Sequence, residues 1–129
     1  QAIEYLEKTI RLVTPAPDHV SRVYQDLAKA RTGFYQYDDA LEAYHKALEL
    51  TPGDTLLIFQ LASHYDNWIK DKRMALLYYE KFMDTRPASR KPLPKIPAEG
   101  GITLSYYDYA ERRIKELREE VFWEEEENR

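Results

Sequence analysis

The chain has 129 residues, of which 43% are hydrophobic and 33% are charged, a balance typical of a folded domain rather than a disordered chain. It contains no cysteine, which excludes disulfides, thiolate metal sites and cysteine nucleophiles. The formal net charge of -4 argues against a nucleic-acid-binding surface, and no apolar run is long enough to cross a membrane.

The first predicted element is a helix within residues 1–14, whose apolar residues recur on one face. Its pattern of small and aromatic residues starts at Ala2 and returns at Ala40 and Ala75, which are 38 and then 35 residues further along. Three copies at nearly constant spacing indicate a repeat. Because the chain begins inside the first copy, we expect residues 1–14 to be the second helix of a truncated repeat of a longer protein.

Residues 21–54 and 55–87 each predict a pair of helices joined by a short turn. In the first helix of each pair, apolar and small residues recur at positions i, i+3, i+4 and i+7, which share one helix face. Pro52 ends the first pair, and Asp54 is expected to cap the next helix by accepting hydrogen bonds from its free N–H groups. The other predicted boundaries are the caps Asp18 and Asp38 and the left-handed stop Gly33.

Residues 88–102 predict a linker without a helix, because prolines and glycines recur through them. A helical pattern returns within residues 103–127, where Ser105 and Asp108 have the spacing of a capping box. One face of this helix is apolar and the opposite face is charged, as in a helix that closes the end of a repeat array. We expect the acidic run at residues 124–127 to be a solvated helix end.

No group of residues suited to catalysis or to metal binding is evident in the sequence. His19, His45 and His64 are 26 and 19 residues apart on different predicted elements, unlike the closely spaced histidine pairs of metal sites. The chain has neither a Gly-rich phosphate loop nor a nucleophile motif. We therefore expect a protein that is not an enzyme and that requires no metal or cofactor.

Residues 21–87 resemble the tetratricopeptide-repeat (TPR) family of helix–turn–helix units, and with the partial copy in residues 1–14 the resemblance covers about two-thirds of the chain. In the first full repeat the resemblance is carried by Tyr24, Leu27, Ala28, Ala40, Tyr44, Ala47 and Pro52. In the second it is carried by Ile58, Leu61, Ala62, Tyr65, Ala75, Tyr79, Phe82 and Pro87, with one extra residue in the internal turn. Arg31 stands where the family usually has Tyr, and Tyr35 stands where it often has Gly.

The resemblance implies an all-α, TPR-type superhelix with a C-terminal capping helix, which acts as a scaffold for protein–protein interaction. In such proteins the first helix of each repeat lines a concave groove that receives a peptide or a partner protein. The positions that match groove positions here are Arg22, Gln25, Asp26, Lys29, Thr32, Leu56, Phe59, Gln60, Ser63, Asp66 and Asn67. Phe59 is expected to be an exposed aromatic residue. The family's clamp for C-terminal carboxylates is not expected, because Gln25 and Lys29 replace its Lys and Asn.

A structural role is the alternative to partner binding. The chain would then be a spacer or self-association segment of a longer protein, without a ligand of its own. Its N-terminal helix lacks a preceding partner helix, and Phe122 and Trp123 follow the last apolar stripe. These two aromatic residues would either close the stripe or contact another part of the protein, so a homo-oligomer through either end of the chain is a further expectation.

Overall fold

The computed structural model describes residues 2–12, 16–85, 95–97 and 103–129. This part of the chain is all-α apart from two three-residue strands, which confirms the predicted class. The helical elements are α1 (Ala2–Leu12), α2 (Pro17–Gly33), α3 (Tyr37–Leu50), α4 (Thr55–His64), the π-helical turn η1 (Tyr65–Ile69), α5 (Lys72–Asp84) and α6 (Tyr106–Glu127). The strands β1 (Lys95–Pro97) and β2 (Thr103–Ser105) pair antiparallel, with Ile96 opposite Leu104.

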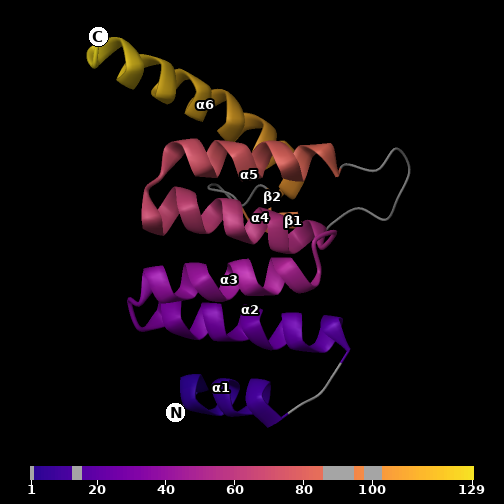
Figure 1. Ribbon diagram of the computed structural model, residues 1–129. Coiled ribbons are helices and arrows are strands. Elements are labelled where there is room, and N and C mark those ends of the chain that lie inside the picture. The colour runs from indigo at the N-terminus through magenta and orange to yellow at the C-terminus, as the bar shows by residue number, and fades with distance from the viewer. Residues whose placement is uncertain (1, 13–15, 86–94, 98–102) are drawn as a thin grey trace.

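The helices form a single column, in which the main contacts join each helix to the next one in the sequence, from α1 to α6 (Figure 1). Successive helices run in opposite directions, so the turn between α2 and α3 and the turn before α5 lie on the same side of the column. The C-terminal end of α6 also lies on this side, at the left of Figure 1. Residues far apart in the sequence are thereby gathered along one edge.

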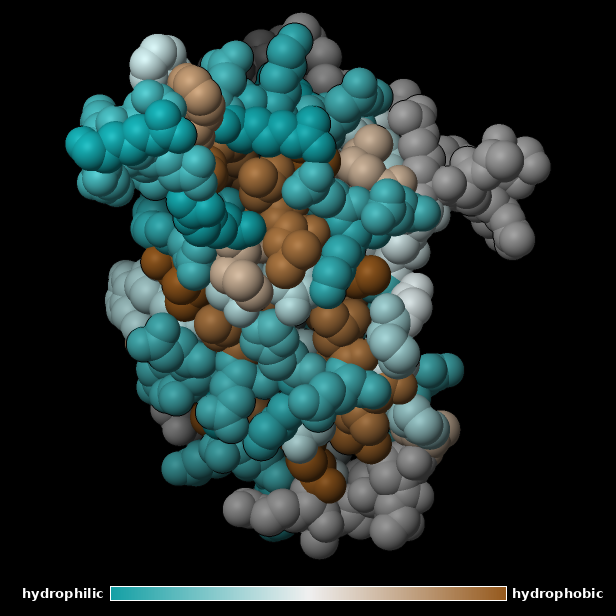
Figure 2. Space-filling view, turned by 45° about the horizontal axis from the view of Figure 1, so that its top comes forward, coloured by the Kyte–Doolittle hydropathy of each residue, from teal (hydrophilic) through white to brown (hydrophobic). Residues whose placement is uncertain are grey.

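Many of the fully buried side chains of the column are small. The fully buried alanines are Ala28, Ala40, Ala47, Ala62, Ala75 and Ala110. A methyl group lets two helix backbones come near each other without the overpacking that a larger side chain would cause. Larger apolar residues, among them Leu57, Leu61, Tyr79 and Phe82, fill the remaining space of a continuous core. On the surface, hydrophobic side chains are interrupted by hydrophilic ones down the face seen in Figure 2.

Side-chain caps begin three of the helices. Asp54 accepts a hydrogen bond from the Leu57 N–H (3.2 Å), and Ser105 accepts one from the Asp108 N–H (3.0 Å), which confirms both predicted caps. Asp71, which we did not predict, caps α5 in the same way. The predicted caps Asp18 and Asp38 were wrong: both lie within the first turn of their helices, where a carboxylate interacts favourably with the helix dipole instead.

The helix boundaries differ from the predictions at two further places. Gly33 is the last residue of α2 rather than a left-handed stop, and the left-handed backbone occurs at Tyr35, with a φ of 63°. The final helix begins at Tyr106 and not at 103, because Thr103–Ser105 pair with β1. Most of the predicted linker, residues 88–94 and 98–102, lies outside the described residues.

The extra residue in the internal turn of residues 55–87 is accommodated by η1. In this turn the Lys70 N–H donates to the Tyr65 carbonyl five residues earlier, and Lys70 itself adopts a left-handed φ of 66°. A π-helical turn takes up one residue more than an α-helical turn while keeping backbone groups hydrogen-bonded. Helix α5 can therefore pack on α4 despite the insertion, and Trp68 projects from the turn.

Candidate functional site

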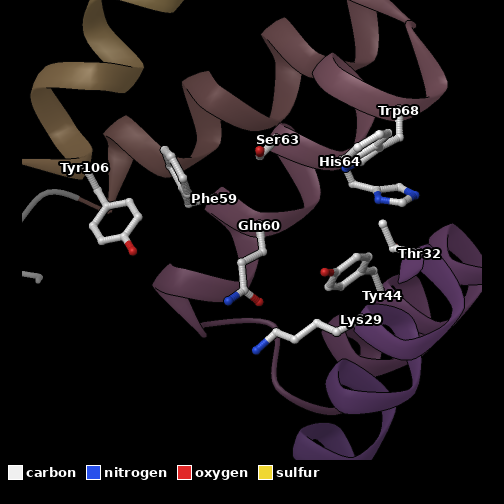
Figure 3. Close-up of a pocket in the computed structure, with 9 residues that line it drawn as sticks. All are labelled: Lys29, Thr32, Tyr44, Phe59, Gln60, Ser63, His64, Trp68 and Tyr106. Atoms are coloured by element: carbon white, nitrogen blue, oxygen red, sulfur yellow. The ribbon is translucent and has the colours of Figure 1, made fainter. Parts of the chain in front are cut away.

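An open cavity of about 410 Å³ lies between α2 and α4 and reaches the start of α6, and we refer to it as the groove. Its lining residues are Lys29, Thr32, Tyr44, Phe59, Gln60, Ser63, His64, Trp68 and Tyr106. Figure 3 shows Lys29 and Gln60 extending toward each other from α2 and α4, with Trp68 at one end of the groove and Tyr106 at the other. The groove is therefore built by elements from both full helix pairs and from α6.

Only some of the predicted partner-binding residues line this groove. Lys29, Phe59, Gln60 and Ser63 do so, as does Thr32. Arg22 and Asp26 are exposed on α2 but are not among the lining residues, and Leu56 is partly buried at the start of α4. Asn67 is exposed and donates a hydrogen bond from its amide to the Ser63 hydroxyl (3.0 Å).

Gln25 is buried, although we expected it to line the groove. Its amide donates to the Ser21 hydroxyl (3.2 Å) and lies 3.4 Å from a carboxylate oxygen of Asp54. Ser21 in turn contacts the Ala47 carbonyl and the Thr51 hydroxyl. This network joins α2 to the end of α3 and to the cap of α4, so Gln25 holds two helix pairs together and is not available to a partner.

Phe59 was also expected to be exposed, and this was wrong. Its side chain is only 7% exposed, and its ring packs against the rings of four aromatic residues at centroid distances of 4.7 to 5.8 Å. These residues are Tyr79, Phe82, Tyr106 and Tyr109. Two of them come from α6, which covers the face of α4 that sequence periodicity alone left open. Phe59 therefore forms the floor of the groove as part of the core.

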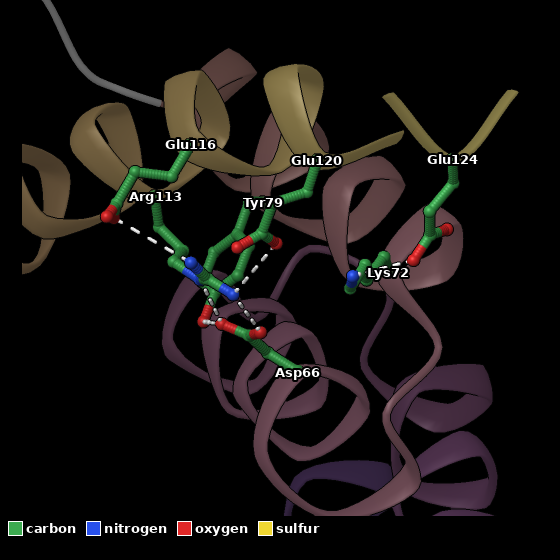
Figure 4. Close-up of polar contacts among 7 residues, drawn as sticks. All are labelled: Asp66, Lys72, Tyr79, Arg113, Glu116, Glu120 and Glu124. Carbon is green, nitrogen blue, oxygen red and sulfur yellow. Dashed lines mark hydrogen bonds and ion pairs between the residues drawn. The ribbon is translucent and has the colours of Figure 1, made fainter. Parts of the chain in front are cut away.

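Asp66 is the third correction, because it is committed to an ion pair. Its two carboxylate oxygens accept hydrogen bonds from the Arg113 guanidinium at 2.7 and 2.8 Å, and one of them also accepts from the Tyr79 hydroxyl at 3.1 Å (Figure 4). The hydrogen bonds to Asp66 raise the pKa of Arg113, while burial, followed by the charge of Asp66, raises the pKa of Tyr79. Asp66 thus fastens η1 to α6 instead of facing a partner.

The groove has few charged groups and one amide acceptor without a partner. Lys29 supplies an exposed ammonium group at its edge. His64 is buried, and burial lowers its pKa, so the ring is neutral near pH 7 and its Nε2 donates to the Tyr37 carbonyl (2.9 Å). The side-chain oxygen of Gln60 is buried and accepts no hydrogen bond within the described residues. The groove can therefore offer positive charge and aromatic surface to a ligand.

Sequence reasoning missed two aromatic residues that shape the groove, Trp68 and Tyr106. The extra residue in the internal turn was a signal for Trp68, because it implied that the end of α4 departs from the regular repeat. Nothing local to Tyr106 placed it beside Phe59, since this contact depends on how α6 packs after the segment that precedes it. Periodicity assigns a helix face, whereas packing decides which other helix covers that face.

Comparison with protein-family models and with curated proteins gives no match to this chain. No helix in the described part of the chain is both long enough and apolar enough to cross a membrane. No three histidine, aspartate or glutamate side chains of that part are grouped in a way that could hold a metal ion. The function is therefore inferred from the helical column and from the groove.

Proposed function

We propose that the chain is a docking module of the TPR type, which holds an extended peptide segment of a partner protein in the groove and catalyses no reaction. The observation that carries this proposal is the position of the groove on the faces of α2 and α4, with α6 at its end. In a TPR superhelix these would be the first helices of successive repeats, with α6 as the capping helix. The 35-residue offset of the two helix pairs and the alanines between their helices support the assignment.

The chemistry of the groove suits a peptide backbone in particular. Lys29 can pair with a backbone carbonyl or with an acidic side chain of the ligand. Trp68 and Tyr106 at the two ends can cover apolar side chains of the ligand. A partner bound in this way contributes main-chain hydrogen bonds for affinity and a few side chains for specificity.

Reversing the charge of Lys29 tests this proposal. Peptides of 12 residues are selected on the wild-type protein from a random displayed library, and their dissociation constants are measured for Lys29→Glu. Loss of a hydrogen bond to a charged group weakens binding by about tenfold or more. For peptides with an acidic residue, we therefore expect the dissociation constant for Lys29→Glu to rise by at least that factor. The midpoint of thermal unfolding should stay within about 2 °C, since the Lys29 side chain is exposed.

The matched control is Lys46→Glu, which reverses the same charge on α3, where Lys46 pairs with Glu42. This variant should bind the selected peptides as the wild type does. Equal binding by both charge-reversal variants, or failure of the selection to enrich any peptide, would contradict peptide docking in the groove.

Self-association is the second candidate function, and the exposed end of α6 favours it. Phe122 and Trp123 are both more than half exposed and contact each other edge to face (5.3 Å between centroids). Under this alternative, sedimentation velocity at rising protein concentration would show a dimer, and the double variant Phe122→Ser/Trp123→Ser would remain a monomer. If the wild type sediments as a monomer at every concentration, the self-association role is excluded.

A further inference from the structure

Three aromatic side chains meet at the end of the groove, where the turn between α2 and α3 lies beside η1. We call this surface the aromatic rim, and it consists of Tyr35, Tyr37 and Trp68. The Trp68 ring stacks on the Tyr37 ring, with centroids 5.0 Å apart and planes inclined by 13°, and Tyr35 meets Tyr37 edge to face. Because Trp68 also lines the groove, the rim continues the groove surface.

The backbone conformation of Tyr35 indicates that its side chain contributes little to the stability of the fold. Its φ of 63° is a left-handed conformation, which glycine or asparagine adopts far more readily than an aromatic residue. Its side chain is 80% exposed, so it gains little from burial in return. An unfavourable backbone conformation combined with an exposed ring is typical of residues retained for contact with a ligand.

The charges beside the rim select the kind of ligand. Asp38 and Asp39 follow Tyr37 in the first turn of α3, and their exposed carboxylates form no ion pair with any described residue. The Tyr37 ring, which directly precedes Asp38 in the chain, has its centroid 6.5 Å from that of His64, one of the groove residues. An exposed aromatic surface next to a free carboxylate is complementary to a cation.

At the other exposed aromatic pair of the chain, two of the neighbouring carboxylates are already in ion pairs. Beside Phe122 and Trp123, the carboxylates of Glu124 and Glu125 are already paired with Lys72 (2.6 Å) and Arg73 (2.7 Å) at the start of α5. Their negative charge is thus largely neutralised within the chain. This second surface resembles the rim in its residue types, but the two carboxylates that directly follow it are paired, whereas those of Asp38 and Asp39 are not, so it serves for comparison.

We propose that the aromatic rim binds an arginine side chain of the docked peptide, with the guanidinium over the rings of Tyr35 and Trp68 and paired with Asp38. The proposal rests on the proposed function, because it adds a charged end to the same groove. Arginine fits better than lysine, since its planar guanidinium stacks on an aromatic face while it forms a two-pronged pair with a carboxylate. The exposed Lys70 in the same turn works against binding by charge alone, so stacking is required.

The test uses the ¹⁵N-labelled full chain, whose only two tryptophans, Trp68 and Trp123, give separate indole N–H signals in NMR spectra. The probe is the capped pentapeptide Gly-Ala-Arg-Ala-Gly, compared with forms that carry lysine or the neutral arginine analogue citrulline. We expect saturable shifts of the Trp68 signal with the arginine peptide. The lysine and citrulline peptides should bind at least about fivefold more weakly, as expected for the loss of a cation–π contact and its ion pair. The Trp123 signal should barely move.

Two variants separate ligand contact from stability. Tyr35→Asn should bind the arginine peptide about fivefold more weakly, yet melt at the same or a higher temperature, because asparagine tolerates the left-handed backbone. Asp38→Asn should weaken binding by a similar factor, whereas Glu124→Gln, beside Trp123, should not. Equal shifts of both indole signals, or unchanged binding by Tyr35→Asn and Asp38→Asn, would overturn the arginine site. These outcomes are independent of the Lys29 test, which would still show whether peptides bind in the groove.

Discussion

Replacing Arg113 with alanine is expected to lower the free energy of unfolding by about 3 kcal/mol, because it leaves the carboxylate of Asp66 buried without its cation. The Asp66 side chain is only 5% exposed and that of Arg113 is 22% exposed, so water replaces little of the lost interaction. Tyr79 would continue to donate one hydrogen bond to Asp66, which places the loss at the lower end of the range for buried pairs. Urea unfolding followed by circular dichroism at 222 nm measures this change.

The matched control removes an arginine from the same helix at the surface. Arg118 pairs with Glu80 at 2.8 Å, but the two side chains are 63% and 42% exposed. Arg118→Ala is therefore expected to cost less than about 1 kcal/mol. Similar losses for Arg113→Ala and Arg118→Ala would show that the contact between Asp66 and Arg113 does not hold α6 on the column.

Replacing Phe59 with alanine is expected to lower the free energy of unfolding by about 3 to 5 kcal/mol, the usual cost of removing a buried aromatic side chain. The Phe59 ring touches two rings of α5 and two rings of α6, so its removal leaves a cavity where three helices meet. The sequence had suggested an exposed residue that could be changed without loss of stability. Thermal and urea unfolding of Phe59→Ala distinguish the two expectations directly.

Phe34→Ala makes the same chemical change at a position that is more than half exposed. It is expected to cost less than about 1 kcal/mol, because little apolar surface returns to water. An unchanged stability of Phe59→Ala would mean that the start of α6 does not pack over α4. Because Phe59→Ala should unfold readily, loss of peptide binding by this variant would not by itself identify Phe59 as a contact residue.

Local features of the sequence were sufficient for most of the helices. The i, i+3, i+4, i+7 periodicity, the breaks at Pro52 and the caps Asp54 and Ser105 depend on residues within one or two helical turns, and the structure confirms them. The caps predicted at Asp18 and Asp38 failed because a carboxylate is favourable at several positions of a first turn, so residue type alone does not distinguish the cap from its neighbours.

The prediction of the groove residues was less accurate than that of the helices, for a different reason. Lys29, Gln60 and Ser63 line the groove because their positions on α2 and α4 face the space between these helices. Phe59, on α4, forms the floor of the groove but is largely covered by α6 through Tyr106, and Asp66, on η1, is paired with Arg113 of α6. The sequence predicted that a further helix follows, but not which residues of α4 and η1 it would cover.

By itself, the sequence determined that this chain is a series of amphipathic helices with alanines at their contacts, because periodicity and small side chains are properties of short segments. Tertiary structure alone decided which polar and aromatic residues remain available to a ligand. Asp66 and Arg113 are 47 residues apart in the sequence, and their ion pair forms only when α6 packs on the column. The same packing leaves Lys29, Gln60 and Trp68 around an open groove. Short segments could not predict this arrangement, because the free energy of burying α6 depends on the whole surface that it meets.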